Sequence, residues 1–126
     1  MAQLVDTDVL LDYLRDHPPA VQFLENDQQE LLISTISVAE LYAGVREGAE
    51  RTALESFFSA FEVVSVDSSI AERGGLYRRD YVRSHAVSLA DALIAATAFV
   101  RGATLVTLSR KHFPMVSDMY VPYRKA

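Results

Sequence analysis

Short runs of strand-forming residues alternate with helical patterns along the whole chain, and this alternation constrains the fold more than any other feature. The predicted strands are Gln3–Val5, Leu31–Thr35, Val63–Val66, Thr104–Thr107 and a short Met119–Val121. A β-α-β-α order is typical of a parallel sheet with helices on both faces, because parallel neighbours need long crossover connections. We therefore predict an α/β fold.

The segments between the strands carry the 3.6-residue periodicity of helices. These predicted helices are Asp8–Asp16, Ala20–Asn26, Ser37–Glu47, Arg51–Phe61, Ser68–Arg83 and Leu89–Arg101. We expect Gly48 to end the third helix and Gly102 the last, since glycine favours the backbone conformation that closes a helix. The Gly74-Gly75 pair weakens the long fifth helix.

Length and composition exclude several classes of protein. The 126 residues suit one domain, which we expect to span 1–126. The absence of cysteine excludes disulfides and thiolate metal sites. Acids interrupt the apolar start of the chain, unlike in a signal peptide, and the longest apolar stretch, Leu89–Val100, is too short to cross a bilayer. A cytoplasmic protein with no membrane contact is the expectation.

The charge distribution is asymmetric. Residues 1–63 hold twelve acids and three bases, a net charge of -9, whereas residues 64–126 hold five acids and nine bases, a net charge of +4. A cation-binding site beside a phosphate-binding surface would produce such a division. Ordinary surface variation explains it equally well, because charge patterns along a sequence do not fix the pattern in space.

Ligands of parallel α/β sheets bind beyond the carboxyl ends of the strands, so acids that follow strands are the first candidates for chemistry. Asp6 directly follows the predicted strand Gln3–Val5, and Asp8 comes two residues later. An aspartate before a helix is also a normal N-cap. Both interpretations of Asp6 remain open on local grounds, and Asp8 is better explained as a cap or an auxiliary residue.

Glu40 lies within the predicted helix Ser37–Glu47. The apolar stripe of this helix consists of Val38, Leu41, Tyr42 and Val45. Glu40 falls on the opposite side, beside the small residues Ala43 and Gly44, which would leave room for a metal ion and a phosphodiester. A solvated glutamate is the simpler local explanation.

Asp91 is the acid that ordinary structure explains least. Ten of the twelve residues of Leu89–Val100 are apolar, so this helix is expected to be buried on all sides. A buried carboxylate is costly unless it is paired, hydrogen-bonded or bound to a cation. Ser88 and Asp91 also resemble a capping box, and capping and function are compatible.

Taken together, the three acids predict a metal site. Each lies at or near the point where a strand is followed by a helix, and such positions converge at one edge of a parallel sheet. Clustered carboxylates stay ionised only if cations neutralise them, and Mg²⁺ or Mn²⁺ suits an all-oxygen cage. Such ions can activate water for phosphodiester hydrolysis. Arg110 and Lys111, after the strand Thr104–Thr107, are candidate phosphate contacts.

Four sequence blocks resemble the signatures of PIN-domain nucleases, and above all those of the VapC toxins of bacterial toxin–antitoxin pairs. The blocks are LVDTDVLLDYL with Asp6, ISTISVAELYAGV with Glu40, LADALIAATA with Asp91, and ATLVTLSRKHFP. They occur in order and span about residues 3–114. Single blocks are weakly specific, but four at these spacings are strong.

The resemblance implies a three-layer α/β/α sandwich around a mainly parallel sheet. It also implies an endoribonuclease that depends on Mg²⁺ or Mn²⁺ and arrests translation. Asp6, Glu40 and Asp91 match the acidic positions of the family, while Thr7 and Thr107 match hydroxyl positions beside the site. A small antitoxin would wrap the protein and block the acidic pocket, and the toxin would form a homodimer.

The last block departs from the pattern T-x-N-x-x-D-F found in many members. Ser109 replaces the asparagine and His112 replaces the acid. This departure puts the binding of a second metal in question, and Asp8 is a candidate for the missing charge.

Other classes of protein fit less of the sequence. A phospho-receiver signalling domain would use Asp6, Asp8, Asp67 and Lys111. That reading leaves Glu40 and Asp91 without a role. A phosphatase of the haloacid-dehalogenase class would use Asp6 and Asp8 but lacks its later acidic pair. A PIN nuclease that is not a toxin and a nuclease-like fold that only binds partners remain alternatives.

Overall fold

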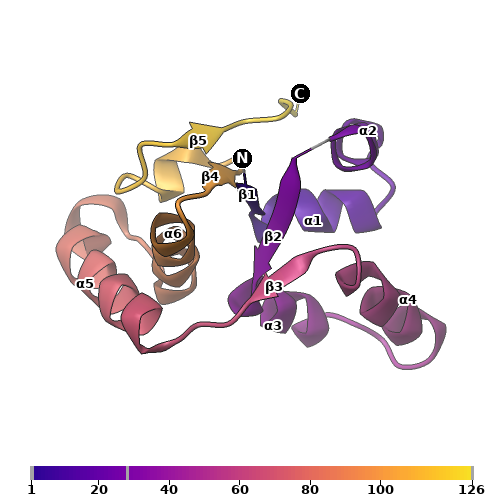
Figure 1. The fold of residues 1–126 in the computed structure, drawn as a ribbon, viewed down its shortest axis with the longest axis horizontal. Helices are drawn as coiled ribbons and strands as arrows, with labels where there is room; N and C mark the ends of the chain where they lie inside the picture. Colours follow the sequence, from indigo (N-terminus) through magenta and orange to yellow (C-terminus); the bar gives the residue numbers. More distant parts are fainter. Residues whose placement is uncertain (1, 28, 126) are drawn as a thin grey trace.

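A computed structural model describes residues 2–27 and 29–125 and contains a five-stranded, all-parallel sheet (Figure 1). The strands are β1 (Ala2–Val5), β2 (Glu30–Ser34), β3 (Glu62–Val64), β4 (Thr104–Val106) and β5 (Met119–Tyr120). They lie in the order β3-β2-β1-β4-β5, so β1 occupies the centre and pairs with both β2 and β4. The predicted parallel sheet is confirmed.

Six α-helices connect the strands in the described part of the chain. They are α1 (Thr7–Leu14), α2 (Pro18–Asn26), α3 (Thr35–Ala43), α4 (Ala49–Phe58), α5 (Ser68–His85) and α6 (Leu89–Arg101). Figure 1 shows α5 and α6 on one side of the sheet and α1 to α4 on the other. This arrangement is the predicted three-layer α/β/α sandwich.

Alternation along the strands builds two separate cores, because successive side chains of a strand point to opposite faces. Leu4, Leu32 and Leu105 face α5 and α6, together with Ile70 and Ile94. The next residues along the same strands, Val5, Ile33 and Val106, face the other side and pack with residues of α1, α3 and α4. The sheet is therefore buried on both faces at its centre.

The sheet order also excludes the receiver-domain alternative. Receiver domains have the order 2-1-3-4-5, in which the first strand lies between the second and the third. Here β1 lies between β2 and β4, and β3 is at the edge. Asp67, the proposed phosphorylation position, instead caps α5, where its Oδ1 accepts a hydrogen bond of 2.9 Å from the Ile70 amide.

The structure corrects the predicted boundaries of α3. The predicted strand Leu31–Thr35 ends at Ser34, because the Ser34 hydroxyl accepts a hydrogen bond from the Ile36 amide and begins the helix there. The helix ends at Ala43, not at Glu47. Gly48 was expected to end it, but Gly48 precedes α4 instead, and its positive φ of 93° belongs to that turn.

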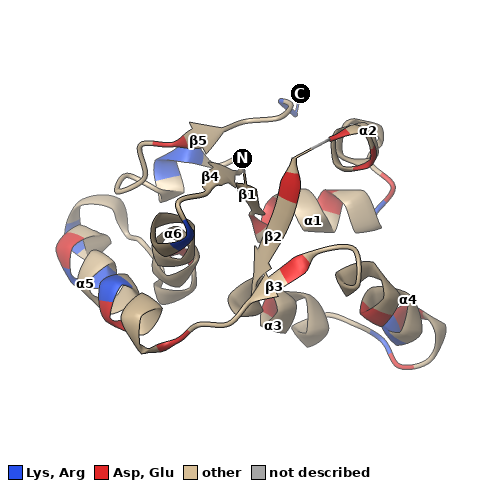
Figure 2. Ribbon diagram, in the orientation of Figure 1, with Lys and Arg blue, Asp and Glu red and all other residues tan. Residues whose placement is uncertain are grey.

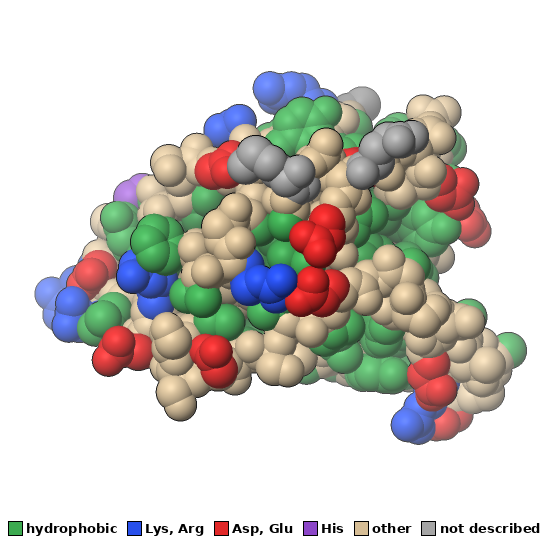
Figure 3. Space-filling model, viewed as in Figure 1, with side chains coloured by type: hydrophobic (Ala, Val, Ile, Leu, Met, Phe, Trp, Pro, Cys, Tyr) green, Lys and Arg blue, Asp and Glu red, His purple; other side chains and the backbone are tan. Residues whose placement is uncertain are grey.

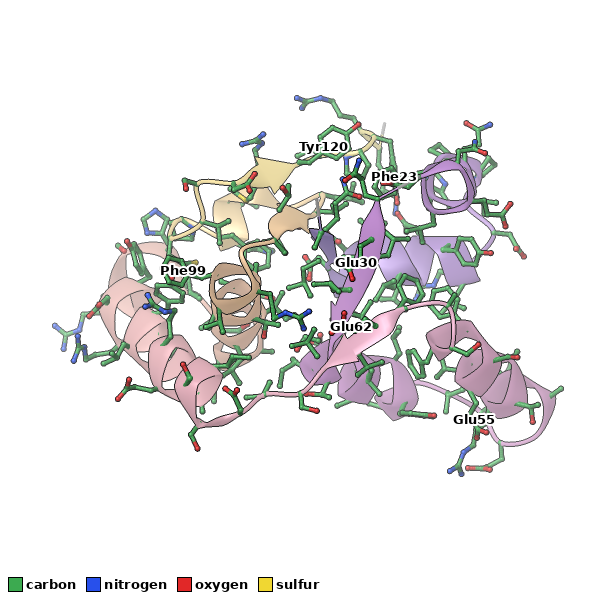
Figure 4. All side chains as sticks on the ribbon, in the orientation of Figure 1. Phe23, Glu30, Glu55, Glu62, Phe99 and Tyr120 are labelled. Atoms are coloured by element: carbon green, nitrogen blue, oxygen red, sulfur yellow. The ribbon has the colours of Figure 1, made fainter. Side chains whose placement is uncertain are left out.

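The expectation that Leu89–Val100 is buried on all sides is wrong. Leu89, Phe99 and Val100 are exposed, whereas the segment from Ile94 to Ala98 is buried. Phe99 is labelled in Figure 4, and the guanidinium of Arg73 from α5 lies 3.8 Å from the centre of its ring. The helix therefore has one solvent-facing side, which the guanidinium partly covers.

The amino ends of the strands form one face of the molecule. Figure 3 shows acidic and basic side chains meeting near the centre of this face. Figure 4 labels Glu30 and Glu62, the first residues of β2 and β3, and the Arg101 guanidinium donates a 2.8 Å hydrogen bond to Glu62. The carboxyl ends of the strands, where ligands are expected, lie at the opposite edge of the sheet.

None of the helices within residues 2–27 and 29–125 combines the length and the apolar character that a membrane crossing requires.

The glycine pair in α5 does not interrupt the helix, which runs unbroken from Ser68 to His85. Gly74 instead allows a close approach of α5 to α6. A Cβ atom added at Gly74 would lie 2.5 Å from Cδ2 and 3.2 Å from Cα of Leu93. A Cβ atom added at Gly75 would meet nothing within 4 Å.

We therefore expect opposite effects from two neighbouring substitutions. Gly74→Ala overpacks the contact between α5 and α6 and should lower the free energy of unfolding by about 1–3 kcal/mol. Gly75→Ala adds helix propensity without a clash and should raise it by up to about 1 kcal/mol. Urea denaturation of both variants measures the difference, and equal effects would contradict the assigned contact.

Candidate active site

The carboxyl ends of the two central strands place Asp6 and Thr107 side by side. Asp6 follows β1, Thr107 follows β4, and the two strands pair in parallel register. The Thr107 hydroxyl donates a buried 2.8 Å hydrogen bond to Oδ2 of Asp6. Connections leave β1 and β4 toward opposite sides of the sheet, so this is the topological switch point at which such folds bind ligands.

Asp6 is both an N-cap and a buried acid. Its Oδ1 accepts a 2.8 Å hydrogen bond from the Thr7 amide at the start of α1, and only 6% of the residue is exposed. Burial, reinforced by the charge of Asp8, raises the pKa of Asp6 to about 8, although the hydrogen bond from Thr107 opposes the rise. Capping alone would favour the ionised form, so the raised pKa reflects the burial of Asp6 first and the neighbouring acid second.

Asp8 lies between the start of α1 and the segment after β4. Its Oδ2 accepts a hydrogen bond of 3.1 Å from the Leu108 amide, and the Ser109 hydroxyl lies 3.4 Å away. Burial raises the pKa of Asp8 despite these donors. Ser109, which replaces the asparagine of the family pattern, is therefore in contact with Asp8, the candidate for the charge that is missing at His112.

Glu40 reaches the same region from α3. The Thr7 hydroxyl donates a 2.7 Å hydrogen bond to Oε1 of Glu40, and the hydroxyl oxygens of Thr7 and Ser37 lie 2.8 Å apart. Because Thr7 has one proton and a carboxylate only accepts, Ser37 must donate to Thr7. Ser37 is fully buried. Sequence reasoning missed Ser37, since only its place three residues before Glu40, one helical turn away, could have indicated it.

Asp91 lies in the first turn of α6, where Ser88 caps the helix by accepting a hydrogen bond from the Asp91 amide. Its side chain remains 27% exposed, and Nδ1 of His112 lies 3.9 Å from its Oδ2. Burial raises the pKa of Asp91, and the charges of Glu40 and Asp8 add to the rise, whereas His112 lowers it. A hydrogen bond with Ser88 also lowers the pKa of the Asp91 carboxyl, so this side chain takes part in the cap as well as in the acidic surroundings.

The structure brings all four acids into one electrostatic cluster. The charges of Asp8 and Asp91 both raise the pKa of Asp6, and Glu40 raises that of Asp91. Arg110 and Lys111 lie in the exposed 3-10 turn Arg110–His112, which follows Ser109. His112, counted at first only as a departure from the family pattern, belongs to the edge of the cluster through its contact with Asp91.

The donor chemistry of the cluster fits a hard divalent cation. Its acids supply only oxygen ligands. Burial raises the pKa of Asp6, Asp8 and Asp91, and neighbouring carboxylates add to the rise at Asp6 and Asp91, so a positive partner would stabilise their ionised forms. Residues 2–27 and 29–125 contain no group of three or more Asp, Glu or His side chains already arranged as a metal cage.

Residues 4–115 match the PIN domain family, and the chain belongs to this family. Ribonuclease VapC19 of Mycobacterium tuberculosis is 43% identical over 96% of this chain and 99% of its own length. Ribonuclease VapC10 of the same organism is 41% identical over 95% of this chain and 92% of its own length. A solved structure described as a toxin–antitoxin complex from Klebsiella pneumoniae superimposes with a TM-score of 0.85 and 28% identity, covering 98% of this chain and 99% of that one. The predicted family and fold class are confirmed.

Proposed function

We propose that this protein is a metal-dependent endoribonuclease that acts as the toxin of a toxin–antitoxin pair and hydrolyses RNA to arrest translation. The observation that carries the proposal is the cluster of Asp6, Asp8, Glu40 and Asp91 at the switch point of a PIN fold. Two relatives that share over 40% of their residues along almost the full length are named ribonucleases.

Asp6, Asp91 and Glu40 would hold Mg²⁺ or Mn²⁺. When bound, such an ion activates a water molecule and stabilises charge on the phosphodiester. The hydroxyls of Thr107 and Thr7 orient the carboxylates of Asp6 and Glu40 through single hydrogen bonds. Asp8 fixes the segment after β4 through the Leu108 amide, which positions Ser109 and the cations of Arg110 and Lys111 beside the acids.

The partners follow from the same proposal. The solved toxin–antitoxin complex shares this fold along nearly the whole chain, so a cognate antitoxin that covers the acidic cluster is the expected protein partner. RNA is the substrate. We also propose a homodimer that works in the cytoplasm, where translation takes place.

Expression of the chain alone should arrest growth, and co-expression of its antitoxin should restore it. The reason is that uncontrolled RNA cleavage stops translation, whereas a covered acid cluster cannot bind metal and substrate. Growth curves after induction measure both effects. Normal growth without the antitoxin, with soluble protein present, would favour a PIN nuclease that is not a toxin. Mapping RNA 5′ ends after brief induction would identify the target.

A further inference from the structure

A basic cleft lies beside the acid cluster, between the segment after β4 and the C-terminal tail. It encloses about 380 Å³. Its walls consist of Leu108, Arg110, Val121, Tyr123, Arg124 and Lys125. Figure 2 shows the basic end of the chain beyond β5, where the tail crosses toward α1 and α2. Three of the six lining residues are cations, and none is an acid.

The tail is fixed in place by a buried acid of α1. Asp12 is 5% exposed, and it accepts 2.8 Å hydrogen bonds from the Tyr123 hydroxyl and from Nζ of Lys125. The ring of Tyr123 also packs at 5.5 Å from the ring of His17, measured between centroids. Hydrogen bonds to Asp12 therefore hold the C-terminal wall of the cleft in place against α1, the helix that also carries Asp8.

The two guanidinium groups of the cleft are available for a ligand. Within residues 2–27 and 29–125, no carboxylate lies within ion-pair distance of Arg110 or Arg124. Lys125 is neutralised by Asp12, but half of its side chain stays exposed. Guanidinium groups bind phosphates through paired hydrogen bonds, so two of them that line one cleft without an ion-pair partner favour a phosphate ligand.

The cleft and the acid cluster share a wall. The amide of Leu108 donates to Asp8, while the side chain of Leu108 lines the cleft. Ser109, next in the chain, contacts Asp8, and Arg110 then opens into the cleft. A strand of RNA that extends from the acids along this shared wall would pass the cleft.

We propose that this cleft binds a backbone phosphate of the single-stranded RNA substrate, next to the phosphate that is cleaved. The inference rests on the proposed function. Arg110 and Arg124 supply the positive charge that the phosphate needs. Leu108, Val121 and the Tyr123 ring supply an apolar wall against which a sugar or base packs without sequence readout. The cleft thus sets the direction in which RNA leaves the acids.

The test measures binding of a fluorescein-labelled single-stranded RNA by anisotropy at several salt concentrations. Asp91→Asn is the background for every protein, so that the RNA stays intact. Arg124→Gln and Arg110→Gln should each raise Kd by about tenfold and lower the slope of log Kd against log salt by about 1, since each removes a phosphate contact. Arg51→Gln, the same change on α4, is the matched control and should alter neither quantity.

Unchanged Kd and salt slope in both cleft variants would overturn the proposal. Loss of antitoxin binding with unchanged RNA binding would overturn it as well, because the cleft would then recognise an acidic protein. The proposed function can fail independently of this proposal. If the wild-type chain binds RNA through Arg124 but never cleaves it, the cleft binds RNA as proposed and the protein is not a nuclease.

Discussion

Asp91→Asn is expected to reduce RNA cleavage by at least about 100-fold while leaving the protein folded. Replacing groups that merely orient a metal ligand costs about 10- to 100-fold, and Asp91 is proposed to contact the metal itself. The fold should persist because Ser88 caps α6 by accepting from the Asp91 amide, which asparagine retains. Initial rates on labelled RNA with Mg²⁺ or Mn²⁺ provide the measurement.

Asp80→Asn is the matched control, since Asp80 is an exposed aspartate of α5 whose partner is Arg79. It should cleave RNA at the wild-type rate. Asp6→Asn should behave as Asp91→Asn does, because both carboxylates belong to the cluster. Full activity in a properly folded Asp91→Asn protein would show that the assigned site is wrong.

The second large effect concerns stability in the absence of metal. The folded-state pKa of Asp6 is raised to about 8 from the ordinary 3.8, so the folded protein holds this proton more tightly than the unfolded chain does. Its contribution to stability is complete at a pH below 3.8 and disappears as the pH rises toward 8. Chelated protein should therefore become less stable between pH 5 and pH 8, by at most about 1.4 kcal/mol per pH unit for one such group.

Thermal unfolding across this pH range measures the effect. In Asp6→Asn the slope should be shallower, and the melting temperature at pH 8 should be higher than in the wild type. Mg²⁺ should raise the melting temperature of the wild type more than that of the variant, because a cation that binds only the folded state stabilises it. Identical pH slopes in the two proteins would contradict the assigned burial of charge.

The sequence predicted the parallel sheet with helices on both faces because short strand-forming runs alternate with helical patterns along the chain. Leu4 and Val5 already differ in the face they occupy, and the same holds for Leu105 and Val106. The ends of α3 were not predictable from periodicity, since they depend on the Ser34 cap at its start and on Gly44, which ends the helix with a φ of -106°. Hydrogen bonds at the helix ends fix these boundaries, and the hydrophobic periodicity of the sequence does not predict such bonds.

The acids after strands were predictable for a topological reason. The carboxyl ends of the strands in a parallel sheet meet at one edge. Asp6 can therefore be placed at this edge from the topology alone, without knowing how side chains pack. The connection of Glu40 to Thr7 through a hydroxyl that Ser37 supports was not predictable, because it depends on how α3 packs beside α1. The hydrogen bonds from Tyr123 and Lys125 to Asp12 were not predictable either, because these partners lie more than 110 residues from Asp12 in the sequence.

The pairing of β1 with β4 has a consequence for folding during translation. Asp6 and its partner Thr107 lie 101 residues apart, so Asp6 is synthesised well before the hydroxyl that it accepts from. Because β1 pairs with β4 over the same separation, this half of the sheet can form only after β4 has been made. A nascent chain that has not yet reached β4 therefore carries Asp6 without an assembled site, which delays the appearance of the site during translation.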